Sequence, residues 1–192
     1  MTMPDVLTFA KEWMERVLEN GDTAIDATAG TGRDTLHLAH CVGSGGHVFS
    51  FDIQTEALEQ TKQRLDKHLL YERTTLINKG HEHAAAQIPA DHRKKLKAAV
   101  FNLGYLPGGN KTITTRTETT IQAISQLLDI IKPGGLLFVV VYPGHPEGRM
   151  EKDKLEEYAA ALPQRDIQVL RYEFMNQVNH PPFLFIFDKR QE

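Results

Sequence analysis

Two polar residues three positions apart, Asn102 and Tyr105, follow an apolar run that ends at residue 101. The Asn102 side-chain oxygen and the Leu103 carbonyl can accept the hydrogens of an amine and so hold its lone pair in line with an electrophilic carbon. The Tyr105 ring can stack on a flat base. We interpret Asn102 and Tyr105 as catalytic residues of a reaction whose rate comes mainly from positioning two reactants. The alternative interpretation is a strand-end turn with a packed tyrosine.

A glycine turn lies earlier in the chain, within Ile25-Asp26-Ala27-Thr28-Ala29-Gly30-Thr31-Gly32. Glycines allow a ligand to approach the backbone closely, and a helix that begins near Asp34 would supply free N–H donors. Asp52 follows 20 residues after Gly32, where a carboxylate can accept hydrogen bonds from ribose hydroxyls. These residues predict a site for a nucleoside-containing cofactor. A tight turn without a ligand and a solvated Asp52 are the alternatives.

The elements that would position these residues alternate between strand and helix. Apolar runs predict strands at 23–27, 47–51, 74–77, 98–103 and 136–141. Helical spacing predicts helices at 6–18, 34–39, 55–70, 83–97 with a break at Pro89, and 114–131. Such alternation is typical of a parallel sheet covered by helices on both faces. After a helix at 152–162, the strand-like runs 168–175 and 183–188 are joined by a loop too short for a parallel crossover. The last strand is therefore predicted to be antiparallel.

This arrangement resembles the class I S-adenosylmethionine (SAM) methyltransferases, which implies an α/β fold with a Rossmann-like seven-stranded sheet, an antiparallel last strand and helices on both faces. The glycine turn resembles their first motif, because a dinucleotide fingerprint would place a third glycine where this chain has Thr35. Asn102-x-x-Tyr105 resembles their Asn/Asp-Pro-Pro-Tyr/Phe signature for amino nitrogens, with Leu103-Gly104 in place of the two prolines. The resemblance implies SAM as the cofactor, bound by Asp26, Thr28, Gly30, Gly32, Asp52, Gln54, Gly80, His81 and Asn102.

Substrate-binding residues are expected in the loops that share this edge of the sheet. These loops are the segments 105–120, 142–148 and 179–182, and the candidates are Tyr105, Pro107, Gly108, Arg116, His145 and His180. For either of the two histidines, an ordinary loop residue is an equal alternative. His81 and His83 lie two positions apart in a helix-opening turn and would point in different directions, so we expect no metal site.

Several of these runs together resemble one small bacterial family that carries the label of rRNA methylases and includes a tRNA 5-aminomethyl-2-thiouridine methyltransferase. The runs are Asp26–Gly32, Lys79-Gly80-His81-Glu82, Asn102–Gly108, Tyr142–His145 and Asn179–Phe183. The resemblance implies methyl transfer to the exocyclic amine of 5-aminomethyl-(2-thio)uridine at the wobble position of tRNA. It makes the anticodon stem-loop the expected partner, which agrees with the amine-holding role of Asn102.

Composition limits the remaining possibilities. The 192 residues predict a single domain, 1–192, with the helix in residues 1–20 packed on it. One cysteine excludes an intramolecular disulfide, and neither a membrane-spanning run nor a signal peptide is evident, so we expect a cytoplasmic protein without a membrane partner. With a net charge of −3, RNA binding would depend on a local patch. Arg116, Lys111 and Arg149 are better placed for this than Lys62, Arg64 and Lys67 or the basic run at 92–97.

Other readings stay open at this point. An rRNA base methyltransferase, or a methyltransferase of small amines or catechols, would use the same cofactor motifs. An NAD(P)-dependent oxidoreductase is disfavoured by the missing third glycine and by the lack of a hydride-transfer pair such as Tyr-x-x-x-Lys. A non-catalytic nucleotide-binding module would leave Asn102 and Tyr105 without a role. The sequence indicates neither a general base nor the oligomeric state, and a homodimer is possible.

Overall fold

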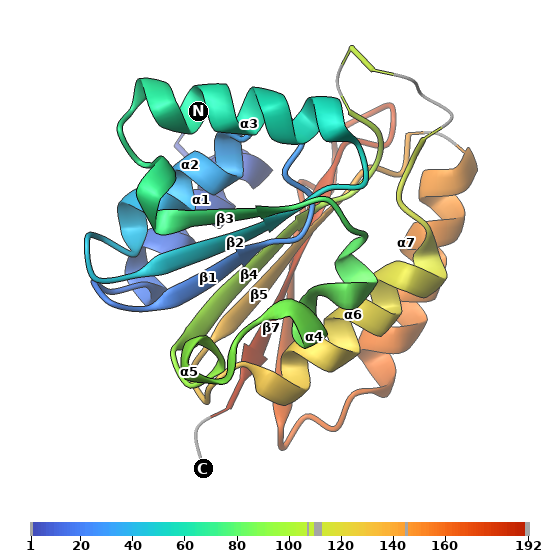
Figure 1. Ribbon diagram of the computed structural model, residues 1–192. Coiled ribbons are helices and arrows are strands. Elements are labelled where there is room, and N and C mark those ends of the chain that lie inside the picture. The colour runs from blue at the N-terminus through green and yellow to red at the C-terminus, as the bar shows by residue number, and fades with distance from the viewer. Residues whose placement is uncertain (1, 107, 110–112, 145, 191–192) are drawn as a thin grey trace.

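Seven strands form one sheet in the order β3-β2-β1-β4-β5-β7-β6 (Figure 1). This computed structural model describes residues 2–106, 108–109, 113–144 and 146–190. The first five strands pair in parallel, whereas β7 is antiparallel to both β5 and β6. The predicted Rossmann-like sheet with an antiparallel last strand is therefore confirmed. The strands are β1 (Thr23–Asp26), β2 (His47–Phe51), β3 (Thr74–Ile77), β4 (Leu96–Asn102), β5 (Leu136–Val141), β6 (Ile167–Tyr172) and β7 (Phe183–Lys189).

Helices cover both faces of the sheet (Figure 1). One face carries α1 (Val6–Val17), α2 (Arg33–Cys41) and α3 (Thr55–Lys67), and the other carries α4 (Ala84–Gln87), α6 (Thr117–Ile130) and α7 (Pro146–Ala161). A short helix, α5 (Ala90–Arg93), precedes β4 at the amino edge, and single 3-10 turns occupy Tyr71–Arg73 (η1) and His81–His83 (η2). None of the described helices is long and apolar enough to cross a bilayer.

Two apolar cores result from the alternation of side chains along the strands. Ala24, Val48 and Ala98 pack beneath α1–α3, while their neighbours Ile25 and Phe49 pack beneath α4, α6 and α7, because successive strand residues point to opposite faces. Every residue of β5 is buried, as its continuous apolar sequence predicts for a central strand. The sheet is thus a rigid support whose strand ends can hold polar residues in place.

The N-terminal helix α1 packs on the sheet. Asp5 caps α1 by accepting a hydrogen bond from the Thr8 amide at 2.8 Å, and the buried face of α1 includes Val6, Ala10 and Met14. The Phe9 ring stacks on Tyr172 of β6 with 3.9 Å between centroids, and the Tyr172 hydroxyl donates to the Pro4 carbonyl at 2.7 Å. Residues near the N-terminus are therefore tied to a strand near the other end of the chain.

The largest departure from the sequence prediction is in the segment 81–97. The predicted helix 83–97 is instead η2, α4 and α5 followed by the start of β4 at Leu96. Pro89 interrupts the helical hydrogen bonding and precedes α5, and the alternating burial of Leu96 and Ala98 around Lys97 is that of a strand. The predicted helix 152–162 also differs from the structure. The corresponding helix, α7, begins at Pro146 rather than Lys152, which agrees with the preference of proline for the first helical turn.

Candidate active site

The polar residues predicted for the site follow the carboxyl ends of the strands, on one edge of the sheet. The connections after β1, β2, β4 and β5 lead to this edge, and the loop between β6 and β7 returns to it, beside α7 in Figure 1. A Cβ placed on Gly144, after β5, would lie 3.8 Å from the His180 carbonyl, so the loops after β5 and β6 lie against each other. Ligands of open α/β sheets bind at this kind of edge.

The glycine turn between β1 and α2 is held tightly against α3. Gly32 has a φ of +75°, and a Cβ on it would come within 2.7 Å of the Thr61 Cα. The Arg64 guanidinium donates to the Thr31 carbonyl at 2.7 Å from the same helix. Only glycine allows both this backbone conformation and this approach, so the turn is pre-shaped before any ligand binds.

Asp52, directly after β2, is fixed by hydrogen bonds from backbone amides. Its Oδ2 accepts a hydrogen bond from Gly30 N at 2.9 Å, and its Oδ1 accepts one from Gln54 N at 2.9 Å. Burial raises the pKa of Asp52, and the backbone hydrogen bonds from Gln54, Gly30 and Ile53 oppose that rise. These three amides leave part of the acceptor capacity of the carboxylate free, which suits a ribose hydroxyl. Gln54, also predicted at the site, contributes its backbone amide here.

Asp26 lies beneath the turn. Its side chain is almost fully buried, with Oδ1 accepting from Thr28 N at 3.1 Å and Oδ2 from the Thr35 hydroxyl at 2.6 Å. The Thr35 hydroxyl also contacts that of Ser50, 2.8 Å away. Burial, and secondly the charge of Asp34, raise the pKa of Asp26 from its usual 3.8 to about 7. Asp26 therefore orders the turn from its buried side, through the hydrogen bonds from Thr28 and Thr35. Gly30 lies within the turn itself.

Asn102 joins β4 to the first turn of α2. Its backbone N–H donates to the Thr28 hydroxyl at 2.7 Å, and its side-chain nitrogen donates to Asp34 Oδ2 at 3.2 Å. The Asn102 side chain also hydrogen-bonds the phenol of Tyr142, which opposes the rise in the Tyr142 pKa caused by burial and by the Asp34 charge. Asp34 and Tyr142 were not predicted as site residues. An acidic residue in the first turn after the glycines is the one signal that could have indicated Asp34.

The loop after Asn102 carries Tyr105 to the surface. Tyr105 is 41% exposed and forms an antiparallel bridge with Thr114, while Leu106 is buried with its side chain next to Gly30. Gly108 has a φ of +78° and open space around its Cα. Tyr105 is thus held at the rim between the glycine turn and the solvent, where a base could stack on it.

The remaining predicted residues lie around this rim or below it. Arg116 precedes α6 and is exposed, and His180 is exposed with a φ of +50°. His81 is 7% exposed, with its ring against Phe101 and its Nε2 3.5 Å from the Thr120 hydroxyl, so it packs under the sheet edge after Gly80. Burial lowers the pKa of His81. Pro107 and His145 lie outside the described residues.

The donor set fits SAM better than a metal or a pyrophosphate. Asp52 offers acceptors for a ribose, and the glycine turn leaves its backbone accessible beside Asn102 and Asp34. Among the described residues, no group of three or more His, Cys, Asp or Glu side chains is arranged to hold a metal ion. The carboxylates Asp34 and Asp52 around the turn would repel a pyrophosphate and suit a cationic sulfonium and ammonium.

Comparisons with known proteins agree with this geometry. The family model described as "Putative rRNA methylase" matches residues 48–188, and the model for protein-L-isoaspartate(D-aspartate) O-methyltransferases matches residues 1–94. The chain is 40% identical over 183 residues to the chloroplastic tRNA (mnm(5)s(2)U34)-methyltransferase of Arabidopsis thaliana, covering 91% of this chain and 66% of that protein. It therefore spans just under two thirds of the length of this curated relative.

Solved structures are similar over almost the whole chain. The "putative rRNA-methylase" of Clostridium thermocellum is 40% identical with a TM-score of 0.94, covering 98% of this chain and 100% of that one. SMU.1697c of Streptococcus mutans, solved in complex with SAH, is 33% identical with a TM-score of 0.88, covering 98% and 99%. The family model spans well over half of the chain. The chain belongs to the "Putative rRNA methylase" family and has the fold of SAM-dependent methyltransferases.

Proposed function

We propose that this protein transfers the methyl group of SAM to the exocyclic amine of 5-aminomethyl-(2-thio)uridine at the wobble position of tRNA. The observation that carries the proposal is the Asn102 amide at the end of β4, oriented by Asp34 beside the cofactor turn. The name of the Arabidopsis relative, 40% identical to this chain, specifies the same kind of reaction.

The cofactor would be held by the turn and by the ends of β1 and β2. Asp52 would accept hydrogen bonds from the ribose, and Gly30 and Gly32 would allow the methionine end to approach the backbone above Asp26. Bound SAM supplies an electrophilic methyl group on a positively charged sulfur. Gly80 follows β3, where the adenine would lie, and the buried His81 would support this wall from beneath.

Asn102 would orient the acceptor amine. A carboxylate only accepts hydrogen bonds, so the Asn102 nitrogen must face Asp34. The side-chain oxygen has two lone pairs, which the Tyr142 phenol and the N–H of the substrate could share. The amine must be neutral when it attacks, and its proton leaves to solvent or to a nearby base. Tyr105, exposed at the rim, would stack on the uracil ring. Holding both reactants in this way provides most of the rate.

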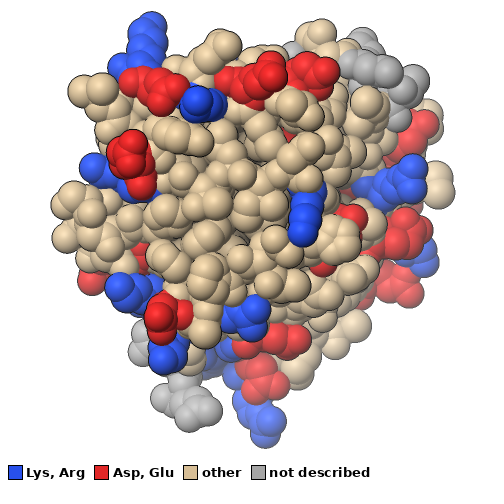
Figure 2. All heavy atoms as spheres, viewed as in Figure 1, with Lys and Arg blue, Asp and Glu red and all other residues tan. Residues whose placement is uncertain are grey.

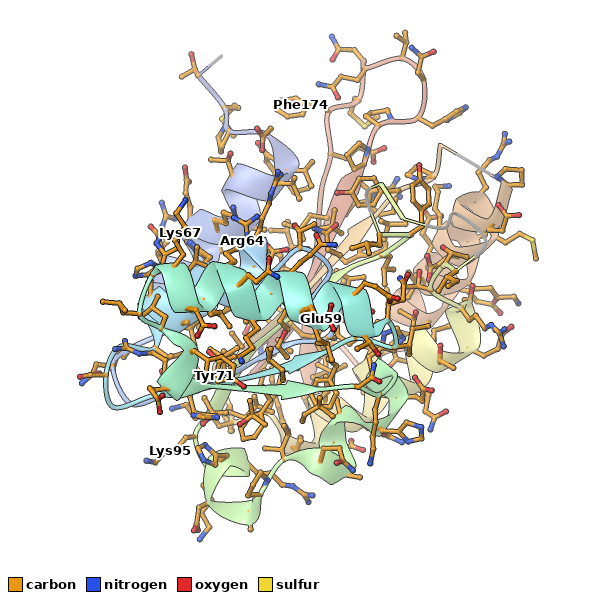
Figure 3. The ribbon with its side chains drawn as sticks, turned by 45° about the horizontal axis from the view of Figure 1, so that its top comes forward. Glu59, Arg64, Lys67, Tyr71, Lys95 and Phe174 are labelled. Atoms are coloured by element: carbon orange, nitrogen blue, oxygen red, sulfur yellow. The ribbon has the colours of Figure 1, made fainter. Side chains whose placement is uncertain are left out.

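The charges at this edge suit an RNA strand. Arg116 and Arg149 are exposed, and neither guanidinium makes an ion pair within the described residues. On the face in Figure 2, Lys and Arg are mixed with Asp and Glu around a largely uncharged area. Lys67 and Lys95, labelled in Figure 3, lie toward the amino edge with Tyr71. RNA recognition would therefore rest on a few arginines at the site rather than on a broad basic surface.

A methyl-transfer assay with nucleoside mass spectrometry tests the proposal. Labelled SAM is incubated with bulk tRNA from a strain that lacks this protein, and with rRNA in a parallel reaction. We expect one methyl group to be added to 5-aminomethyl-(2-thio)uridine. Label in rRNA alone, as the family description would have it, or label in small amines alone, would contradict the tRNA substrate while leaving the cofactor assignment intact. The homodimer stays a prediction. The cytoplasmic location also stays a prediction, because the Arabidopsis relative is named as chloroplastic.

A further inference from the structure

A buried carboxylate lies directly behind the loop that carries Tyr105. Glu151, in the second turn of α7, is 5% exposed. Its Oε2 accepts a hydrogen bond from the Thr115 hydroxyl at 3.2 Å, and its Oε1 accepts one from the Thr120 hydroxyl at 3.2 Å. Burying a carboxylate costs free energy unless its oxygens are well hydrogen-bonded, and none of the contacts that would hold SAM explains its presence.

Thr115 connects Glu151 to the loop after Asn102 by hydrogen bonds. Its hydroxyl accepts a hydrogen bond from Gly104 N at 3.0 Å while donating to Glu151, and its own N–H donates to the Gly104 carbonyl at 3.1 Å. Gly104 has a φ of +122°, so it is held by both backbone groups in a conformation that other residues rarely adopt. A continuous hydrogen-bonded chain thus runs from Gly104 through Thr115 to Glu151.

The other carboxylate oxygen of Glu151, Oε1, is connected through Thr120 to His81, a residue predicted to bind the cofactor. Thr120 is fully buried in α6, and its hydroxyl lies 3.2 Å from Glu151 and 3.5 Å from His81 Nε2. His81 in turn packs against Phe101, the residue before Asn102. One carboxylate therefore links α7, the start of α6 and the acceptor loop, three segments that the chain brings together from distant positions.

We propose that Glu151, acting through Thr115, is a positioning residue that fixes the Asn102–Tyr105 loop for the methyl acceptor. The inference rests on the proposed function for the identity of the acceptor, but the coupling itself is a property of the chain. Glu151 is 5% exposed and its oxygens are bound by Thr115 and Thr120, so it would act on the reactants only through other residues. Without Glu151, the Thr115 hydroxyl that accepts the Gly104 N–H would no longer be fixed in place, and the positions of Asn102 and Tyr105 relative to the glycine turn would be less constrained.

The donor and acceptor roles in this network predict that one substitution keeps the hydrogen bonds to the loop and another removes them. In Glu151→Gln the remaining oxygen can still accept from Thr115, since the Thr120 hydroxyl can donate instead to the Arg116 carbonyl, 3.0 Å away, and accept from the new amide. In Thr115→Val the shape is kept, but both the acceptor for Gly104 N–H and the donor to Glu151 are removed. We therefore expect Glu151→Gln to retain the positioning effect and Thr115→Val to lose it.

Three measurements on the full-length protein test this. Amide exchange of Gly104, followed by NMR without substrate, should be about tenfold faster in Thr115→Val than in wild type. The Kd for SAM should stay within about twofold, while kcat for tRNA at saturating SAM falls about 10- to 100-fold. Thr119→Val is the matched control, because the Thr119 hydroxyl contacts only the Arg116 carbonyl at 2.9 Å among the described residues. It should leave all three quantities unchanged, and Glu151→Gln should stay close to wild type.

Two results would overturn the proposal. One is Gly104 exchange and kcat at wild-type values in Thr115→Val. The other is a loss of SAM affinity that parallels a lower melting temperature, which would mean that the network only stabilises the fold. If wild type transfers no methyl group to any RNA, the proposed function fails, whereas amide exchange and SAM affinity still decide whether Thr115 and Glu151 hold the loop. The failures of the two proposals are thereby distinguishable.

Discussion

The Asn102 side-chain nitrogen lies 3.2 Å from Asp34 Oδ2, so the end of β4 and the first turn of α2 are joined by a hydrogen bond to a charged acceptor. Such bonds are stronger than those between neutral groups. This contact decides which end of the amide faces the substrate, because Asp34 can receive only an N–H. The specificity for an amine would then come from two residues that are 68 positions apart in the chain.

Asn102→Ala should separate catalysis from cofactor binding. The substitution removes the oxygen that would orient the amine, whereas the Asp52 contacts and the glycine turn stay intact. We expect kcat to fall about 100-fold and the Kd for SAM to change less than about threefold. Labelled-methyl transfer and calorimetric titration with SAM measure the two quantities. Equal losses in both would contradict the role assigned to Asn102.

Asp52→Ala should weaken SAM binding by roughly 1.5–3 kcal/mol, the usual range for hydrogen bonds to a charged group. Asp52 also holds the Gly30 and Gln54 amides, so part of this loss would come from a less ordered turn. Titration calorimetry together with the melting temperature in the absence of SAM separates the two contributions. SAM affinity equal to that of wild type would remove Asp52 from the site.

Asp26→Asn should change the pH dependence of stability. The pKa of Asp26 is raised from 3.8 to about 7 in the folded protein, so the folded state binds a proton that the unfolded state has lost between those values. Stability contributed by this group is therefore lost as the pH rises from about 4 to 7. The melting temperature of Asp26→Asn relative to wild type should increase between pH 5 and pH 8. A constant difference across this range would show that Asp26 does not titrate as described.

Gly32→Ala and Gly21→Ala form a matched pair, since both glycines have a positive φ. A Cβ on Gly32 would lie 2.7 Å from the Thr61 Cα, whereas nothing lies within 4 Å of a Cβ on Gly21. Both variants should lose about 1 kcal/mol or more from backbone strain, and Gly32→Ala should lose further stability because α3 must move. Urea unfolding measures the difference. Equal losses would mean that the contact with α3 adapts without cost.

Arg149→Ala and Arg116→Ala should reduce the salt dependence of tRNA binding. Each phosphate contact removed lowers the slope of log K against log salt by about 1. Lys95→Ala is the control, because Lys95 precedes β4 at the opposite edge of the sheet and should leave the slope unchanged. The slope is obtained by titrating a labelled anticodon hairpin at several salt concentrations. If only Lys95→Ala alters it, RNA binds at the wrong edge for the proposed reaction.

The sequence predicted the central elements well because their signals are local. The bounds of β2, β3 and β5 match the expected strands residue for residue, since each is an apolar or alternating run closed by polar or turn-forming residues. The end of the segment 81–97 was misjudged because its alanines and charged residues favour a helix locally. Leu96 and Lys97 instead belong to β4, which is stabilised by pairing with β1 and β5.

The site residues likewise fall into two groups: those that local sequence patterns predict and those that only long-range contacts bring together. The positions of Asn102, Asp52 and the glycines at one edge follow from the parallel direction of β1, β2 and β4, which the alternation of strands and helices predicts. The partners Asp34 and Tyr142, and the Glu151 anchor, depend on side chains meeting across α2, β4, β5 and α7. No spacing in the sequence encodes those encounters, so only the folded structure reveals them.

The sheet order also has a consequence for synthesis on the ribosome. β7 lies between β5 and β6, although it leaves the ribosome after both. When residues 167–172 emerge, they have no neighbouring strand to pair with, and the apolar β5 presents an open edge until residues 183–189 follow. The packing of α1 likewise remains incomplete until Tyr172 has been synthesised. An unpaired apolar edge of this kind promotes aggregation, so a nascent chain that stalls before residue 183 would be a natural client for a chaperone.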